Sequence, residues 1–544
     1  MMRLLPFLLT LFTVSNAYSQ HNQRFTRQDT LRGTLGPERT WWDVTYYDLS
    51  MRIFPDTKSI EGTNVIHYRV TGAPNRMQID LQQPMELRKA VQDGKELTFT
   101  REGNAFFIDM PADQPKGKIK QVALTFGGKP REAKNAPWDG GIVWKTDSLN
   151  RPWIASACQG LGASVFWPNK DHQSEEPDSM QIAVTVPGAL TNVSNGKLRS
   201  VKDGPDATRT FTWFVSNPIN NYDVALNIGH YAHFSDSYKG EAGNLPLDFW
   251  VLDYHLAAAK QHFGVVKPMM QCFEHWFGPY PFYADTYKLV ETPHLGMEHQ
   301  SAVAYGNQYK MGYRGKDLSG SGWGLKWDFI IIHETGHEWF GNNITTKDIA
   351  DMWVHESFTN YSETLFTECR YGKEAGNAYL QGIRKNIAND IPIIGPYGVN
   401  TEGSGDMYYK GANMVHTIRQ IINNDEQFRQ ILRGLNKTFR HQTVTTQQVE
   451  DFINRKSGIN FDKVYDQYLR HTQPPVFEYS ISGGQLKYRW VADVKGFDMP
   501  IRVSMGTGKP VMLQPTAEWK SMPLKNASKF GIDPNFYVIP KKVQ

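Results

Sequence analysis

The sequence predicts a multidomain α+β protein, in which an N-terminal antiparallel β domain precedes a mainly helical domain and a small C-terminal β-sandwich. The chain of 544 residues is too long for a single hydrophobic core. Short runs of alternating apolar and polar residues fill residues 41–238, whereas apolar residues recur at helical spacing over residues 239–472. Alternation returns over residues 473–544, where Pro474 and Pro475 interrupt the chain. These two changes of period predict the boundaries of the three domains.

Both β domains are predicted from alternation and from turn residues. Residues 44–53, 182–186 and 210–214 alternate in this way, and Gly-Asn, Asp-Gly and Pro-rich breaks separate such runs. Over residues 477–539 the breaks are Gly-Gly and Gly-Thr-Gly. Short alternating runs with frequent breaks are typical of antiparallel sheets, so we expect this architecture at both ends of the chain.

The helices of the middle domain are predicted from spacing and from stop signals. A first helix is expected over residues 255–276, because the segment F-G-P-Y-P ends it. A second is expected over residues 327–340, between a Gly/Ser loop and Gly341, and a third over residues 351–371. Further helices are expected at residues 412–422, 425–435, 446–456 and 461–469.

The first residues differ in character from the rest of the chain. Arg3 precedes an apolar run over residues 4–14, which ends in small residues up to Ala17. This pattern is typical of a secretory signal peptide, which we expect over residues 1–19, with a buried N-terminal helix as the alternative. Residues 20–40 are polar and aperiodic, and we expect a linker there. We therefore expect an exported protein, periplasmic or extracellular, with no membrane span in the mature chain.

Composition and cysteine usage exclude several classes of protein. The chain is 40% hydrophobic and 21% charged, with a net charge of +4, and no cluster of lysine and arginine is long enough to follow a phosphate backbone. Nucleic acid is therefore not an expected partner. Cys158, Cys272 and Cys369 form no C-x-x-C pair. One disulfide is possible, but three separated thiols are better interpreted as small buried hydrophobes than as metal ligands.

One short motif indicates metal chemistry. Residues 333–337 read H-E-T-G-H. On a helix, His333 and His337 lie one turn apart on the same face and can bind one metal ion, while Glu334 can take a proton from a metal-bound water. A catalytic zinc needs a third ligand, and Glu356 is the candidate, nineteen positions after His337 in an apolar-flanked segment. The alternative is two core histidines and a helix-surface acid, which this combination of spacings disfavours.

The surrounding motifs resemble a known family. The sequences H-E-T-G-H-E-W-F-G-N and W-V-H-E-S-F-T-N-Y are similar to the H-E-x-x-H-x-W-F-G-N and W-L-N-E-G-F-A-x-Y motifs of the aminopeptidase N family of zinc metallopeptidases. These are the gluzincins of peptidase family M-one, the family of leukotriene-A hydrolase. Residues 277–281, 294–299 and 408–411 resemble the family's F-G-x-P-Y-P, G-x-M-E-N and Y-E-K-G motifs. The resemblance implies a thermolysin-like catalytic domain, in a short form that lacks the large C-terminal helical domain, and hence a more open cleft.

The resemblance also implies a reaction. One Zn²⁺ per chain would be bound by the two motif histidines and Glu356, and Glu334 would act as the general base in hydrolysis of the N-terminal peptide bond. Tyr408 matches the tyrosine whose hydroxyl stabilises the oxyanion. The neighbouring Tyr409 is the rival, although the Y-x-K-G register favours Tyr408.

Other positions are implied as substrate contacts. Glu298 matches the glutamate that binds the free α-ammonium of the substrate, and Gln159 resembles a second contact to this group from the β domain. Gly296 and Met297 would line the substrate strand and the first side-chain pocket. Glu363 lies seven positions after Glu356 and could orient a zinc-bound histidine.

Some residues depart from the family pattern. His299 and His355 stand where asparagine is usual, and Ser357 stands where glycine is usual. Residues 167–172 replace the family's P-C-x-D-E-P stretch beside the amine site. None of these is a proposed ligand or base, so the departures bear on specificity rather than on catalysis.

The function predicted from the sequence is that of a secreted zinc aminopeptidase acting on peptides with a free N-terminus. The alternatives are a zinc endopeptidase or an epoxide hydrolase of the same fold, or an inactive metal-bearing binding protein. Glu298 argues against an endopeptidase, because an internal peptide bond offers no ammonium group. The intact pair of Glu334 and Tyr408 argues against an inactive protein.

Overall fold

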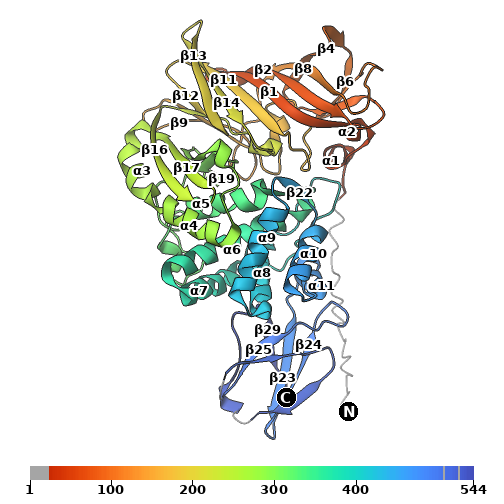
Figure 1. Ribbon diagram of the computed structural model, residues 1–544, viewed down its shortest axis with the longest axis vertical. Helices are drawn as coiled ribbons and strands as arrows, with labels where there is room; N and C mark the ends of the chain where they lie inside the picture. Colours follow the sequence, from red (N-terminus) through yellow and green to blue (C-terminus); the bar gives the residue numbers. More distant parts are fainter. Residues whose placement is uncertain (1–23, 507–508, 525–526) are drawn as a thin grey trace, which may run out of the picture.

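The computed structural model describes residues 24–506, 509–524 and 527–544, so the expected signal peptide lies outside the described residues. Figure 1 shows three parts along the longest axis of the molecule. The N-terminal strands lie at one end, the helices lie in the middle, and a small β domain lies at the other end. The predicted fold class is confirmed by this order of parts.

The segment before the first long strand is not the linker that the sequence predicted. It contains two short helices, α1 (Arg27–Gly33) and α2 (Pro37–Thr40). Thr26 and Asp29 form a reciprocal capping box at the start of α1. Arg39 is completely buried, and its guanidinium pairs with Asp80 of the β domain. The prediction was wrong because helix caps and buried ion pairs both use polar residues, which a polar, aperiodic pattern does not distinguish from a loop.

The N-terminal domain is a mostly antiparallel β structure. Among the described residues, its largest sheet has the order β13 (Lys197–Gly204), β14 (Thr208–Val215), β11 (Ser179–Pro187), β1 (Trp42–Phe54), β2 (Ser59–Val70), β8 (Ile119–Gly128), β4 (Glu86–Gln92), β5 (Lys95–Leu97). Two smaller sheets have the orders β12 (Thr191–Val193), β15 (Asn227–Gly229), β10 (Pro152–Ala157), β9 (Gly141–Thr146) and β3 (Met77–Asp80), β7 (Ala105–Ile108), β6 (Phe99–Glu102). Strands β1 and β11 pair in parallel, with Leu49 opposite Ile182. Strand β10 ends two residues before Gln159 and so determines where this residue lies.

The middle domain begins with a sheet of its own. The order of this sheet is β16 (Tyr231–Gly240), β17 (Gly243–Leu252), β18 (Tyr287–Glu291), β20 (Val303–Tyr305), β19 (Gly296–Met297). Because β16 pairs with β17 along its whole length and β17 pairs with β18, the predicted boundary at residue 238 falls inside β16. Sheet topology therefore places the boundary before Tyr231. A hairpin strand alternates in the same way whichever domain it joins, so its pattern does not reveal the boundary.

The helices pack below this sheet in Figure 1. They are α3 (Leu256–His262), α4 (Val266–Phe277), α5 (Phe329–Gly336), α6 (Trp353–Tyr371), α7 (Lys373–Ile383), α8 (Tyr409–Ile422), α9 (Asp425–Thr438), α10 (Thr446–Ser457) and α11 (Asp462–Tyr465). The helix predicted over 255–276 is divided by a tighter turn at Phe263–Val265. The helix predicted over 327–340 ends at Gly336, and a distorted turn follows in which Gly341 has φ 133°. Helix α7 was not predicted, because its two glycines weaken the helical signal.

A disulfide joins two helices of the middle domain. Cys272 in α4 is bonded to Cys369 near the end of α6, across a sequence separation of 97 residues, while Cys158 is free and buried. The interpretation of all three cysteines as buried thiols was therefore wrong for this pair. The packing of α4 against α6, which brings the two Cα atoms to 6.1 Å, is a tertiary feature that cysteine spacing does not report.

The C-terminal domain consists of two small sheets. One has the order β27 (Lys520–Pro523), β24 (Gln485–Val491), β23 (Val476–Ser482), β29 (Ile539–Lys542), and the other β26 (Val511–Leu513), β25 (Ile501–Met505), β28 (Phe530–Ile532). Trp490 and Phe477 lie in the core that these sheets share with the helical domain. The middle domain contains a further pair of strands, β21 (Ile344–Thr346) and β22 (Gln442–Val444), which are parallel. Within the described residues, none of the helices has the length and apolar character needed to cross a membrane.

Candidate active site

Two buried helices position the motif residues. Helix α5 carries His333 and Glu334, and every one of its residues is buried. Its first turn is fixed by Asp328, whose carboxylate accepts the backbone N–H of Ile330 at 2.9 Å, as expected for an N-cap. Helix α6 packs against α5 and presents Glu356 in its first turn. A helix that is apolar except for its reactive residues is stable only in such a buried position.

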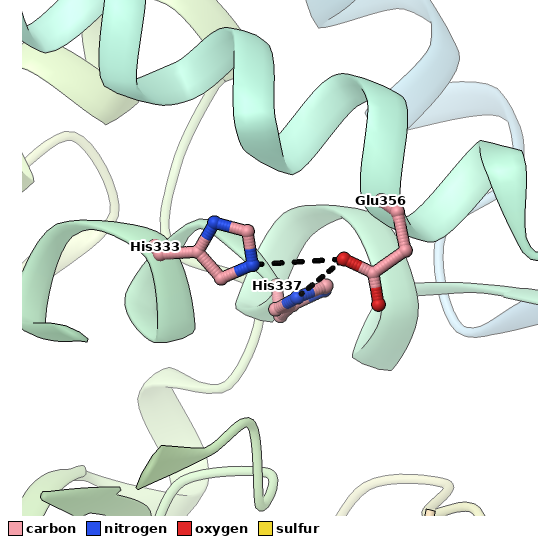
Figure 2. Close-up of side chains that lie close together, drawn as sticks. All are labelled: His333, His337 and Glu356. Carbon is pink, nitrogen blue, oxygen red and sulfur yellow. Dashed lines mark ion pairs between the residues drawn. The ribbon is translucent and has the colours of Figure 1, made fainter. Parts of the chain in front are cut away.

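The three predicted metal ligands converge on one point. Figure 2 shows both imidazoles directed towards the carboxylate of Glu356. Its Oε2 atom lies 3.6 Å from Nε2 of His333 and 3.4 Å from Nε2 of His337. Zinc–nitrogen bonds of about 2.0–2.1 Å in a tetrahedral site place neighbouring ligand atoms about 3.4 Å apart. Glu356 Oε2 is also buried, and no hydrogen-bond partner for it exists among the described residues. This donor set fits a zinc ion.

The rings are held in the orientation that metal binding requires. Nδ1 of His333 lies 2.7 Å from Oε1 of Glu363, and Nδ1 of His337 lies 3.0 Å from the carbonyl oxygen of Phe340. Both Nδ1 atoms can donate a proton to these acceptors, which leaves both Nε2 lone pairs free for the metal. Burial alone would lower the pKa of His333, but the carboxylates of Glu356 and Glu363 raise it well above its ordinary value. A dication at this point would satisfy the same negative charge.

Glu334 lies between the triad and the edge strand β19. One of its carboxylate oxygens, one from Glu298 and one nitrogen of His337 all lie within 4.8 Å of one another. Burial is the main cause that raises the pKa of Glu334, to about 7. A Cβ atom at Gly296 would lie 2.9 Å from Oε1 of Glu334 and 2.7 Å from Cγ2 of Ile330. Only glycine therefore lets the strand approach this carboxylate so closely.

The predicted amine-binding residues come from two domains. Glu298 is buried, and its Oε1 accepts a hydrogen bond of 3.1 Å from the hydroxyl of Tyr222 in the N-terminal domain. Gln159, also from that domain, donates from Nε2 to Oε1 of Glu356 at 3.4 Å. The structure thus brings both residues to the metal triad, although 139 positions separate them in the sequence.

Both tyrosines of the Y-Y-K-G segment line the cleft. The ring of Tyr408 stacks on that of His333 with 6.0 Å between centroids, and its pKa is raised well above 10 by burial and by nearby carboxylates. Ser357, one of the departures from the family pattern, donates to the carbonyl oxygen of Met407 at 2.7 Å and so fixes the turn before Tyr408. Tyr409 also lines the cleft, one position further along.

The histidine departures lie behind the site. His299 is completely buried next to Glu298, and neither ring nitrogen has a hydrogen-bond partner within the described part of the chain. His355 accepts the backbone N–H of Thr346 through Nε2 at 2.9 Å. Neither lines the cleft, so their contribution is to packing behind it.

The site lies in a cavity of about 750 Å³ between the N-terminal and helical domains, and residues of both domains line it. Sequence reasoning missed several of them, among them Trp138, Tyr313, Asn400 and Glu402. They lie on loops far from the motifs, and their residue types are ordinary for loops. The Gly/Ser-rich stretch before Tyr408 was the available signal for Glu402.

Comparisons with known proteins agree with this site. Residues 262–468 match the peptidase family M1 domain. Aminopeptidase B of Rattus norvegicus is 24% identical over 334 residues, which cover 58% of this chain and 47% of that protein. Leukotriene A-4 hydrolase of Xenopus laevis is 23% identical over 430 residues, covering 72% and 65%. The chain thus spans about half the length of the curated aminopeptidases it matches.

The fold is also similar to that of a solved structure. The crystal structure of an M1 zinc metallopeptidase from Deinococcus radiodurans has a TM-score of 0.69 at 20% identity, and the match covers 80% of this chain and 95% of that one. The range that matches the family model, residues 262–468, contains His333, His337 and Glu356. The sequence match of residues 262–468 to peptidase family M1 thus agrees with the fold and with the geometry of the triad.

Proposed function

We propose that this protein is a zinc-dependent aminopeptidase that removes the N-terminal residue from peptides. The observation that carries the proposal is the buried carboxylate of Glu298 beside the triad of His333, His337 and Glu356. An ion pair between Glu298 and a free α-ammonium would hold the first peptide bond of a substrate next to the metal. An internal segment of a chain has no charge to offer to this carboxylate, which disfavours an endopeptidase.

The backbone of a substrate can bind along the free edge of β19. This strand is the last in its sheet, and its backbone pairs with β20 on one side, Gly296 lying opposite Tyr305. Its other side can accept an extended peptide as an additional strand. Such a strand would run past Glu334, because Gly296 lies directly against this carboxylate.

Each residue of the site has a separate role in the proposed hydrolysis. The two histidines and Glu356 would hold Zn²⁺, which would supply the Lewis acidity needed to polarise the scissile carbonyl and to activate a water molecule. Glu334 takes a proton from the attacking water and passes it to the leaving nitrogen. Tyr408 donates its hydroxyl to the oxyanion of the tetrahedral intermediate, and its raised pKa keeps the donor protonated at neutral pH.

We also propose that the protein is exported, to the periplasm or the medium. The apolar N-terminal run supports this location, and so does the bond between Cys272 and Cys369, because disulfides persist in oxidising compartments. A related M1 zinc metallopeptidase from Deinococcus radiodurans was crystallised with a bound Tyr-Ser-Ala substrate, which supports short peptides as substrates here.

Hydrolysis of aminoacyl-anilides by the purified protein tests the proposal. We expect turnover that a zinc chelator abolishes and added zinc restores, and no turnover of the N-acetylated substrates. Glu334→Gln should lose activity while still binding one zinc. Glu374→Gln, which removes an exposed carboxylate on α7, is the matched control and should keep the parent rate. Chelator-insensitive turnover, or full activity of Glu334→Gln, would contradict the mechanism.

A further inference from the structure

The two short helices that precede the first long strand pack behind the proposed amine site. Helices α1 and α2, residues 27–40, are here called the N-terminal arm. Figure 1 shows α1 where the N-terminal domain meets the helical domain. Among the residues that the structure describes, those lining the cleft include none from the arm. Any effect of the arm on the reaction must therefore act through other residues.

The end of α1 is held by buried polar side chains. Gln78 of the β domain donates from Nε2 to the carbonyl oxygen of Leu31 at 3.0 Å. Arg39 of α2 donates from Nη1 to the carbonyl oxygens of Arg32 and Thr34 at 2.8 and 3.0 Å. The last carbonyl groups of a helix have no partners within the helix. These contacts therefore fix the end of α1 against the β domain, although the helix has only seven residues.

The same end of α1 also touches the helical domain. A Cβ atom built on Gly33 would lie 2.5 Å from the backbone nitrogen of Val399 and closer still to that of Asn400. Only glycine lets the two backbones approach so closely. Asn400 in turn donates from Nδ2 to the carbonyl oxygen of Gly160 at 3.1 Å. Helix α1 thus packs against a segment that itself contacts the loop of Gln159.

Arg32, in the last turn of α1, binds this loop directly. Its Nη1 donates to the carbonyl oxygen of Leu161, and its Nη2 lies 3.5 Å from Oδ2 of Asp171. A Cβ atom on Gly162 would collide with the guanidinium, so Arg32 packs directly on the backbone of the loop. The side chains of Arg32 and Asp171 are only 19% and 7% exposed. Hydrogen bonds from a charged donor are strong in such a shielded position.

The loop, residues 159–162, depends on outside contacts for its position. Strand β10 fixes only its start. Gly160 and Gly162 have φ of 71° and 91°, and glycine leaves a backbone more conformational freedom than any other residue. The carbonyl oxygen of Leu161 is held from outside the loop, by Arg32 and by Nε2 of Gln82 at 2.7 Å. Arg32 is the charged and therefore the stronger of these two donors.

From this geometry we propose that Arg32 is a positioning residue for the amine site: it holds the loop so that Gln159 can contact the α-ammonium of a substrate. Arg32 does not line the cleft, so it acts through Gln159. Glu298, the other proposed amine contact, is bonded to Tyr222 and does not depend on this loop. The inference rests on the proposed aminopeptidase activity, since it concerns how that enzyme would bind the amine.

The test compares two inhibitors that differ only in the α-amino group. Leucine hydroxamate and its des-amino analogue both offer a hydroxamate to zinc, whereas only the first offers an ammonium. The ratio of their inhibition constants therefore separates amine binding from zinc binding. We expect Arg32→Gln to lower the preference for leucine hydroxamate by about tenfold, as for loss of one hydrogen bond to a charged group. The KM for leucyl-anilide should rise by a similar factor, with kcat within about twofold.

A double variant separates positioning from general destabilisation. Gln159→Ala should lower the inhibitor preference by about tenfold as well. In that background Arg32→Gln should lower it by no more than about twofold further, because the contact that Arg32 supports is already absent. Arg32→Lys keeps a cation beside Asp171 and a donor for the loop, so its preference should lie between those of the parent and Arg32→Gln.

Arg27→Gln is the matched control on the same helix. The Nε atom of Arg27 lies 3.1 Å from Oε1 of Glu102, and its side chain is 65% exposed. An exposed pair of this kind contributes little, and Arg27 does not contact the loop. We therefore expect the parent values of the inhibitor preference and of KM. Thermal unfolding of each variant shows whether it is folded; if Arg32→Gln is not, Arg32→Met, which keeps the aliphatic packing without a donor, takes its place with the same expectation.

Each other outcome has a distinct meaning. Equal weakening of both inhibitors by Arg32→Gln overturns the proposal, because it assigns Arg32 to the metal site or to the fold as a whole. An unchanged preference in Arg32→Gln or in Gln159→Ala also overturns it, and so does a full additional loss in the double variant. If the parent enzyme cleaves no anilide, the proposed aminopeptidase activity itself fails.

Discussion

Replacement of Glu363 by glutamine should weaken zinc binding without disturbing the fold. Glu363 is completely buried, and its Oε1 lies 2.7 Å from Nδ1 of His333. The hydroxyl of Tyr379 donates to Oε2 at 2.5 Å, and Asn360 donates to Oε1 at 2.8 Å. Glutamine has nearly the same shape, but its amide replaces a charged acceptor with a neutral one. Loss of such a partner of a metal ligand costs about 10- to 100-fold in metal affinity, which corresponds to about 1.4–2.7 kcal/mol.

Zinc affinity measured by competition with a chromophoric chelator at neutral pH is the direct assay. Tyr379→Phe is the graded control: it removes one hydrogen bond from the other oxygen of Glu363 and keeps the charge beside His333, so its effect should be the smaller. Because zinc binds only the folded protein, the zinc-dependent rise in Tm should shrink in the same order. A Glu363→Gln protein whose zinc affinity stays within about twofold of the parent would refute this reasoning.

Four further predictions follow from particular contacts. Tyr408→Phe should lower kcat by about 10²–10³ with little change in KM, as for loss of an oxyanion donor, whereas Tyr409→Phe should stay within about fivefold; the reverse order would transfer the role to Tyr409. Gly296→Ala should lower kcat/KM by at least about tenfold, because the new methyl group would lie 2.9 Å from Oε1 of Glu334; parent-like kinetics would show that the strand yields. The base must be ionised, and burial raises the pKa of Glu334 to about 7. A bound dication shifts this pKa back towards the ordinary 4.5, and kcat should fall as the pH drops through the resulting pKa. A flat pH profile from about 4 to 8 would contradict Glu334 as the base. Removal of the 97-residue Cys272–Cys369 crosslink by a double alanine substitution should cost about 2–4 kcal/mol of unfolding free energy, and a reductant should lower the Tm of the parent but not of this variant.

Local patterns in the sequence were sufficient for the main architecture. Alternation predicted the β character of both terminal domains, and helical spacing predicted α6, α8, α9 and α10 to within a few residues and the end of α4 to within one. The spacing of the metal ligands could be predicted because His333 and His337 lie on one helix and Glu356 lies on the helix after it. In such cases the periodicity of the chain itself determines which side chains meet.

Errors arose where distant segments decide the structure. Helices α1 and α2 depend on a polar capping box and on the buried pair of Arg39 and Asp80, and the Cys272–Cys369 bond depends on the packing of α4 against α6. None of these features has a period in the sequence. The same reason explains why β16, although correctly predicted as a strand, was assigned to the wrong domain.

By itself, the sequence predicted the chemistry that we propose for this protein: a metal triad with a base, and a family resemblance that its sequence relatives support. Only the tertiary structure decided how the cleft is built around that triad. It brings Gln159 and Tyr222 from one domain to Glu298 and Glu356 of another, and it places Glu402 beside Gly160. Ligands on adjacent helices are fixed by short-range geometry, whereas the walls of a substrate pocket come from loops that meet only when the domains pack.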